Sequence, residues 1–190
     1  MKLRTILLVS ALGASSIALA GPTTTDTTTD HTKLADMDAQ VVAHLHAVDM
    51  LEIDLGKLAQ KNGTAAVKQY GQMLVKDHTA FDTKLTAFAN KHGMSTIPYD
   101  TTQTPAEKTD MDTEKGKLAA LKGSAFDQEL LPMMKMAHDQ EITKLDTNVS
   151  MVTDANLKSM LTALKPTLQK HSEQAAKLQS PTLRSSTPTD

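Results

Sequence analysis

The sequence predicts an all-α protein, a four-helix bundle with a short extra crossover helix between the second and third long helices. Three observations lead to this prediction. Apolar residues recur in steps of three and four along four long segments, the spacing of helices that pack along a bundle. Capping residues and glycines separate these segments. No segment has the alternating pattern of a strand, so helices are expected to pack on helices.

The first long helix is expected over residues 33–61. Its row of apolar residues has one gap, at the position of Glu52. The following Asn62-Gly63 is expected to stop the helix, with Gly63 in the left-handed conformation. The apolar row consists of Val41, Leu45, Val48, Leu55 and Ala59.

The second long helix is expected to start after Thr64 as N-cap and to end with Gly93 in the C′ position. Its apolar row also has one gap, which His78 fills. Residues 104–107 then predict the start of a short helix, with Pro at N1 and a capping box. This helix is mostly polar and is expected to lie across the bundle. The apolar row of the second long helix is Val67, Gly71, Leu74, Phe81, Leu85 and Phe88.

The third long helix is expected to open at Ser124, with Asp127 completing a capping-box pattern. Pro132 follows closely enough to be tolerated near the first turns. The single gap in the apolar row of this helix is His138. The row itself consists of Leu131, Met134, Ile142, Leu145 and Val149.

The last long helix is expected to start at Asp154, which is a good N-cap residue. Its apolar row has a gap at His171, and Pro166 is expected to bend the helix about one turn earlier. The row consists of Leu157, Leu161, Leu164, Leu168, Ala175 and Leu178.

The ends of the chain differ in composition from the helical part. Residues 1–20 combine a basic start, an apolar run and an Ala-Leu-Ala ending, the pattern of a secretory signal peptide cleaved after Ala20. Residues 21–32 are Thr-rich and are expected to form a disordered spacer, and residues 181–190 a disordered tail. One domain is therefore expected over residues 33–180, in a protein that is periplasmic or secreted.

Charge and composition exclude several classes of function. The formal net charge is -2, and loss of Lys2 and Arg4 with the signal peptide brings it to -4. No basic patch remains, so nucleic-acid binding is not expected. There is no Cys, which excludes disulfides and thiolate ligands. The apolar run at the start is too short to span a bilayer, so no stable membrane insertion is expected after signal cleavage.

Each long helix therefore carries one polar interruption: Glu52, His78, His138 and His171. A buried polar group without a partner costs about 1–3 kcal/mol, so we expect the four side chains to converge on one another or on a ligand. Glu141 follows His138 by three residues and shares its helix face. Imidazoles and carboxylates together suit Zn, Mn, Fe or Cu. The sequence predicts a site for one such ion, or else a buried network that only specifies packing.

Other polar and soft side chains receive different interpretations. Asp77 is expected to support His78 from behind or to lie on the surface. His44 and His46 are two residues apart, cannot share a helix face, and are expected at the surface. The run Met133-Met134-Lys135-Met136 could provide soft Cu(I) ligands near His138, although Met at helical spacing is usually core filler.

These motifs, taken together over residues 34–178, resemble the bacterial exported family called domain of unknown function 4142. The resemblance implies a ferritin-like bundle and export, and it supplies no activity. One departure is Leu130, where the family pattern suggests Tyr. The motifs are Glu52 with Leu55-Gly56-Lys57-Leu58-Ala59, Met73 with Asp77-His78, Gly123 with Phe126-Asp127, His138, and Pro166 with His171.

Two hypotheses for function remain after this comparison. The first is an exported bundle that binds one metal ion through Glu52, His78, His138 and His171, with Glu141 as an extra carboxylate. The second is a non-enzymatic envelope or stress protein whose His and Glu residues only specify packing. Ferritin-like di-iron sites use Glu-x-x-His motifs, which are absent here, so oxidative catalysis ranks last. No catalytic residue and no partner protein is indicated.

Overall fold

The computed structural model describes residues 33–98 and 105–180, which form five helices and no strand. The predicted all-α bundle with an extra helix between the second and third long helices is thereby confirmed. The predicted signal peptide, spacer and tail lie outside the described residues. The helices are α1 Asp36–Asn62, α2 Ala65–Lys91, α3 Pro105–Ala120, α4 Gly123–Met151 and α5 Ala155–Gln179.

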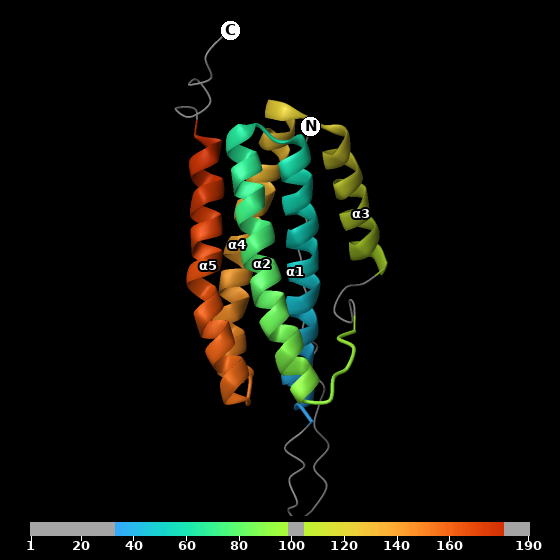
Figure 1. Ribbon diagram of the computed structural model, residues 1–190, viewed down its shortest axis with the longest axis vertical. Coiled ribbons are helices and arrows are strands. Elements are labelled where there is room, and N and C mark those ends of the chain that lie inside the picture. Colours follow the sequence, from blue (N-terminus) through green and yellow to red (C-terminus); the bar gives the residue numbers. More distant parts are fainter. Residues whose placement is uncertain (1–32, 99–104, 181–190) are drawn as a thin grey trace, which may run out of the picture.

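The four long helices form two antiparallel hairpins (Figure 1). α1 packs mainly on α2, and α4 mainly on α5. The connection through α3 returns the chain to the end where α2 began, so α2 and α4 run in the same direction. α3 runs along the outside of the bundle beside α1, which corrects the prediction that it lies across the bundle. Its buried Leu118 joins the apolar core at that flank.

The bundle core consists of two apolar clusters with a polar layer between them. One cluster contains the beginnings of α1 and α5 and the ends of α2 and α4, including Leu45 and Leu85. The other contains the opposite halves of the same helices, including Leu55 and Leu74. The buried Glu52, His78, His138 and His171 fall between these clusters along their helices.

The turn between α1 and α2 differs from the prediction in two ways. Gly63 has φ -73, so it is not a left-handed stop; a Cβ there would lie 2.6 Å from Cγ1 of Val67, which explains the glycine by space. Asp127 does not cap its own helix. Its carboxylate instead accepts the backbone N–H of Thr64 at 3.2 Å and the hydroxyl of Thr64 at 2.6 Å. A capping pattern in the sequence thus stabilises the start of a different helix.

Two other helix ends follow the prediction, and one proline does not. Gly93, just beyond α2, has φ 77, the left-handed conformation that glycine favours. The carboxylate of Asp154 accepts the backbone N–H groups of Asn156 and Leu157. Pro132 lies inside α4, more than two turns after Gly123, rather than near the first turns.

Asp38 connects the beginning of α1 to the turn between α4 and α5. It is buried, and its carboxylate accepts three hydrogen bonds at 2.9 Å, two from the backbone N–H groups of Thr153 and Asp154 and one from the Thr153 hydroxyl. Asp38→Ala leaves these donors without a protein acceptor, so we expect the free energy of unfolding to fall by about 2 kcal/mol in chemical denaturation. Asp36→Ala, exposed in the same turn, is the matched control and is expected to change it by less than about 0.5 kcal/mol.

α1 and α2 approach each other closely at two glycines. A Cβ on Gly71 would lie 2.5 Å from the carbonyl oxygen of Gly56, and a Cβ on Gly56 would lie 2.9 Å from the carbonyl oxygen of Gly71. Both distances are shorter than real Cβ contacts. The absence of side chains at these two positions therefore sets the spacing between α1 and α2 one to two turns from His78.

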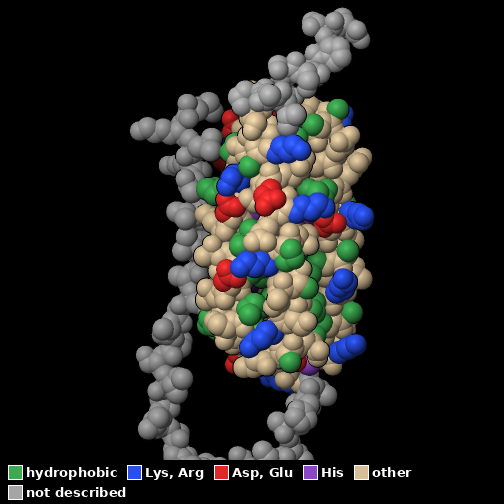
Figure 2. All heavy atoms as spheres, turned by 90° about the vertical axis from the view of Figure 1, so that its left-hand side faces the viewer, with side chains coloured by type: hydrophobic (Ala, Val, Ile, Leu, Met, Phe, Trp, Pro, Cys, Tyr) green, Lys and Arg blue, Asp and Glu red, His purple; other side chains and the backbone are tan. Residues whose placement is uncertain are grey.

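The surface carries charges of both signs. Figure 2 shows one face, on which Lys side chains and Asp or Glu side chains are interspersed with scattered apolar ones. Among the described residues, the large apolar side chain with notable exposure is Met151, at 40%. None of the described helices combines the length and apolar character needed to cross a bilayer.

Candidate metal centre

Three imidazoles from three different helices meet in the polar layer. His78 of α2, His138 of α4 and His171 of α5 are all buried, with at most 2% of each residue exposed. One nitrogen from each ring can be chosen so that all three lie within 4.8 Å of one another. The ring centroids lie 5.2 to 6.0 Å apart. Of the four side chains predicted to converge, the structure thus groups these three.

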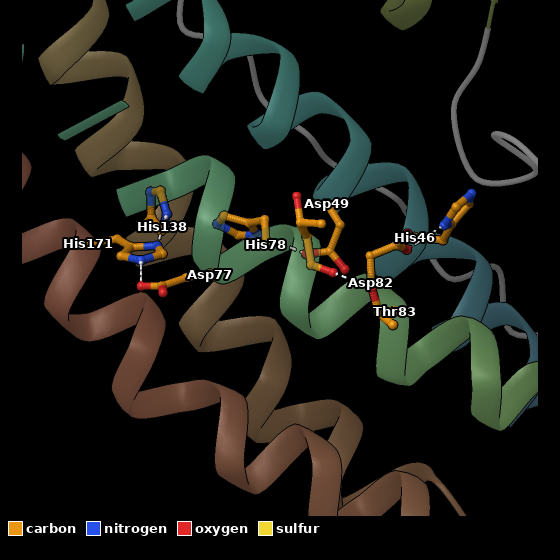
Figure 3. Close-up of polar contacts among 9 residues, drawn as sticks. His46, Asp49, Asp77, His78, Asp82, Thr83, His138 and His171 are labelled. Carbon is orange, nitrogen blue, oxygen red and sulfur yellow. Dashed lines mark hydrogen bonds and ion pairs between the residues drawn. The ribbon is translucent and has the colours of Figure 1, made fainter. Parts of the chain in front are cut away.

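One nitrogen of each ring is held from outside the group; Figure 3 shows His78 beside Asp49 and His171 beside Asp77. Nδ1 of His78 lies 2.8 Å from Oδ1 of Asp49, and Nε2 of His171 lies 3.1 Å from Oδ2 of Asp77. Nδ1 of His138 donates to the carbonyl oxygen of Met134 at 2.7 Å. The nitrogens left for a shared ligand are therefore Nε2 of His78, Nε2 of His138 and Nδ1 of His171. Carboxylate and carbonyl acceptors behind the rings are typical of histidines that bind metals.

The contacts of His171 require more protons than a neutral imidazole carries. The carbonyl of Met134 only accepts, so in neutral His138 the proton is on Nδ1 and Nε2 has a lone pair. Nδ1 of His171 lies 3.2 Å from that lone pair, while Nε2 of His171 faces the Asp77 carboxylate. A neutral His171 has one N–H for these two acceptors. One of the two contacts therefore joins two acceptors, unless a cation lies between the rings.

A second proton on His171 is a poor candidate for that cation. Burial, together with the neighbouring His138 and His78, lowers the pKa of His171 to about 4, although the hydrogen bond to Asp77 opposes this. Burial also lowers the pKa of His78, against the charge of Glu52. Both imidazoles are therefore neutral near pH 7. Neutral imidazole is the form that binds a metal ion.

The pair formed by His78 and Asp49 is also incompletely satisfied. Nε2 of His78 and Oδ2 of Asp49 are buried with no hydrogen-bond partner. Burial, together with the charges of Asp82 and Glu141 and against that of His46, raises the pKa of Asp49 to about 9. Whether Nε2 of His78 carries a proton or a lone pair, it lacks a partner in the protein. A buried polar atom in this state costs about 1–3 kcal/mol.

Glu52 lies in the same layer but outside the group of three nitrogens. It is 4% exposed, and its Oε2 has no hydrogen-bond partner. It lines a cavity together with His78, His138 and Glu141. Its negative charge acts on His78 more strongly than any other charge does. The structure thus places Glu52 beside the three imidazoles rather than among them.

Glu141 is engaged elsewhere. Both of its oxygens lie near Nε2 of His44, at 3.2 and 3.0 Å, and Lys144 lies 3.8 Å away. Burial alone would raise the pKa of Glu141, but the hydrogen bonds and charge of His44, with Lys144, outweigh it and hold this pKa below its ordinary value. Of the five predicted ligands, the structure brings together the three histidines and leaves both glutamates outside the group.

The predicted surface positions of His44 and His46 are wrong. His44 is buried against Glu141, and His46 is half-buried, with Nδ1 2.6 Å from Oδ1 of Asp82. The argument from spacing fails because α1 is covered on two sides, by α2 and by α4. Residues two apart therefore both reach a neighbouring helix.

Sequence reasoning missed Asp49 and left Asp77 undecided. Asp49 follows Leu45 by four residues and precedes Glu52 by three, so it continues the buried face of α1. That spacing is a usable signal, although the apolar row of α1 runs through Val48 instead. Asp77 supports His171 of α5 rather than its neighbour His78. Nothing in the local sequence indicates this, because the contact joins two helices far apart in the chain.

Two of the three nitrogens already have the spacing of ligands that share one small transition metal ion. Two nitrogens that bind one ion at about 2.1 Å with tetrahedral angles lie roughly 3.4 Å apart. Nε2 of His138 and Nδ1 of His171 are 3.2 Å apart. Three protein ligands leave a fourth position free, which is the arrangement of metal sites that exchange a ligand.

Comparison with known proteins gives a family and no activity. No curated protein and no solved structure matches the chain. The sequence model of one family, described as domain of unknown function (DUF4142), matches residues 23–178. This match includes every described helix almost to the end of α5 and all the residues of the polar layer. The chain therefore belongs to the DUF4142 family.

Proposed function

We propose that the protein is an exported helical bundle that binds one transition metal ion through Nε2 of His78, Nε2 of His138 and Nδ1 of His171. The observation that carries this proposal is the mismatch of protons around His171. Its two ring nitrogens face two acceptors, and burial opposes the second proton that would satisfy both. An ion between the rings removes the mismatch and also gives the unpartnered Nε2 of His78 a partner.

The donor set narrows the choice of ion. Three imidazoles without thiolate suit Zn, Cu or Fe, and Mn is favoured more by carboxylates. Glu52 and Glu141 supply negative charge near the ion, and Glu141 is already hydrogen-bonded to His44. The buried Asp49 and the half-buried Asp77 orient two of the three rings.

The alternative is a buried network that only specifies packing, and it leads to a different expectation for the hydrogen bonds of the polar layer. In such a network the polar side chains pair with each other as matched donors and acceptors. Here four buried side-chain atoms in the described residues have no partner, and three belong to Asp49, Glu52 and His78. A cluster of unpaired atoms around three imidazoles favours metal binding over a structural role.

The test is the metal content of protein purified without a His-tag. We expect about one equivalent of a transition metal by elemental analysis, or after reconstitution with Zn and removal of excess ion. His78→Ala and His171→Ala are each expected to lose the bound metal, because two nitrogens hold an ion much more weakly than three. His92→Gln, a half-buried histidine at the end of α2, is the matched control and should retain it.

Thermal unfolding provides an independent measurement. An ion that binds only the folded chain raises stability by about 4 kcal/mol at a concentration of 1,000 times Kd, so Zn should raise the Tm of the wild type and of His92→Gln. His78→Ala should show no such rise. Substoichiometric metal in the wild type, with no change of Tm on adding Zn, Cu, Mn or Fe, would contradict the proposal and favour the structural alternative.

Export is the second part of the proposal, and it rests on residues 1–20. The basic start, the apolar run and the Ala18-Leu19-Ala20 ending support cleavage after Ala20. We expect the mature protein, isolated from the periplasm or the medium of a bacterial host, to begin at Gly21 by mass spectrometry. An intact Met1 in protein recovered from the cytoplasm would contradict this expectation. Ala18→Arg with Ala20→Arg should block the cleavage.

A further inference from the structure

A small cavity adjoins two of the three imidazoles. Its volume is ≈ 50 Å³, and it lies mainly between α1 and α4, with Met111 of α3 on its wall. His78, His138 and Glu52 contribute its polar side chains together with Glu141. The remaining wall is apolar and includes Ala47 and Leu51 of α1. His171 does not line it, so the cavity reaches the group of three imidazoles from the side of His78 and His138.

Glu52 is the unusual member of this wall. A carboxylate that is 4% exposed normally accepts hydrogen bonds from the protein, yet Oε2 of Glu52 has none. It is not one of the donor atoms that lie within 4.8 Å of one another. Oε2 of Glu52 therefore lines the same cavity as His78 and His138 without belonging to the group of ligand atoms. Its position suits it to accept a hydrogen bond from a molecule that lies between Glu52 and the ion.

We propose that the fourth coordination position of the metal centre opens into this cavity and takes an exchangeable small ligand, water or a small anion. Glu52 accepts a hydrogen bond from that ligand when it is water. This inference rests on the proposed metal binding and adds to it an accessible coordination position and a role for Glu52. Glu52 is a positioning residue here, because it acts through the ligand and not on the ion.

The cavity limits the ligand by size and by charge. One water needs roughly 10–15 Å³, so a volume of ≈ 50 Å³ holds a few waters or a linear triatomic ion and nothing the size of a metabolite. The wall of the cavity has no cationic side chain that would attract an anion, and the charge of Glu52 repels an anion. A protonated or neutral ligand is therefore favoured in the wild type, and an anion should bind better once the charge of Glu52 is removed.

The experiment uses the full mature chain loaded with Co(II), whose visible absorption reports changes of its ligands, and sodium azide as the probe. We expect saturable azide-dependent changes in the Co(II) bands of the wild type. Glu52→Gln should bind Co(II) with the same stoichiometry and azide about tenfold more tightly. Ala47→Leu, which fills the cavity from α1, should bind Co(II) and lose the response to azide. Leu51→Phe provides a second filling variant if Ala47→Leu does not fold by circular dichroism.

The outcomes separate this inference from the proposal on which it rests. Failure of the wild type to bind Co(II) would overturn the metal centre itself. Stoichiometric Co(II) binding with no azide response in either the wild type or Glu52→Gln would overturn the open position alone. Loss of Co(II) from Glu52→Gln would make Glu52 a direct ligand and would also overturn this inference. An azide response that survives both filling variants would place the ligand outside the cavity and contradict it.

Discussion

Gly71→Ala is expected to lower the free energy of unfolding by about 3 kcal/mol. The new Cβ would lie 2.5 Å from the carbonyl oxygen of Gly56 and 2.8 Å from Cβ of Ala59. Both neighbours are fixed in α1, so α1 and α2 must separate to admit one methyl group. Overpacking of this kind typically costs about 1–3 kcal/mol and sometimes more, and it outweighs the gain of up to about 1 kcal/mol from replacing a helical glycine by alanine.

Gly116→Ala is the matched control for this substitution. Gly116 also lies inside a helix, α3, but a Cβ there would meet nothing within 4 Å. We expect this variant to be unchanged or more stable by up to about 1 kcal/mol, since only the helix propensity changes. Urea denaturation of both variants measures the difference. Equal stability of Gly71→Ala and the wild type would show that the spacing of α1 and α2 does not depend on this glycine.

The second large effect is a stability optimum of the metal-free protein near pH 6.5. On the acid side, His171 has a folded pKa of about 4 and the pKa of His78 is also lowered, so the unfolded chain binds these protons first. Stability is therefore present above about pH 6.5 and is lost as the pH falls towards 4. At about 1.4 kcal/mol per pH unit, His171 alone accounts for roughly 3 kcal/mol of this loss.

Above pH 6.5, one carboxyl group makes the free energy of unfolding fall as the pH rises. Burial raises the pKa of Asp49 to about 9, far above its ordinary 3.8, so the folded chain holds a proton that the unfolded chain has released. This contribution is fully present below pH 3.8 and is lost as the pH rises through 9. Below pH 6.5 the contribution of Asp49 to the free energy of unfolding changes in the opposite direction to those of the two histidines, but it does not cancel both. Above pH 6.5 the histidine contributions no longer change, so the loss of the Asp49 contribution lowers the free energy of unfolding.

Chemical denaturation in the presence of a chelator at pH 4.5, 6.5 and 8.5 measures both limbs. Asp49→Asn is expected to remove most of the decrease between pH 6.5 and 8.5 and to leave the acid limb in place. His92→Gln is a useful control, because this half-buried histidine lies at the end of α2 beside Asp154 and is not part of the three imidazoles. A wild-type stability that rises steadily from pH 6.5 to 8.5 would contradict the assignment to Asp49.

The local pattern was sufficient to predict the helices and most of the polar layer. Steps of three and four place Leu45, Leu55 and Glu52 on one face of α1 whatever the rest of the chain does, because that periodicity belongs to the helix itself. The same holds for His78, His138 and His171, each of which interrupts an apolar row and is buried. Helix ends were less certain, since Asp127 matches a capping pattern but binds Thr64 of another helix.

The sequence by itself determined that each of the four long helices would bury one histidine or glutamate. Only the tertiary structure decided which atoms meet. The offset and rotation of α1 against α2 pair Asp49 with His78, those of α2 against α5 pair Asp77 with His171, and those of α1 against α4 draw Glu141 to His44. These contacts join residues between 29 and 97 positions apart, and a shift of about one residue in any helix would replace them. Helical periodicity carries no information about such offsets, because they arise from the packing of close-fitting surfaces such as Gly56 against Gly71.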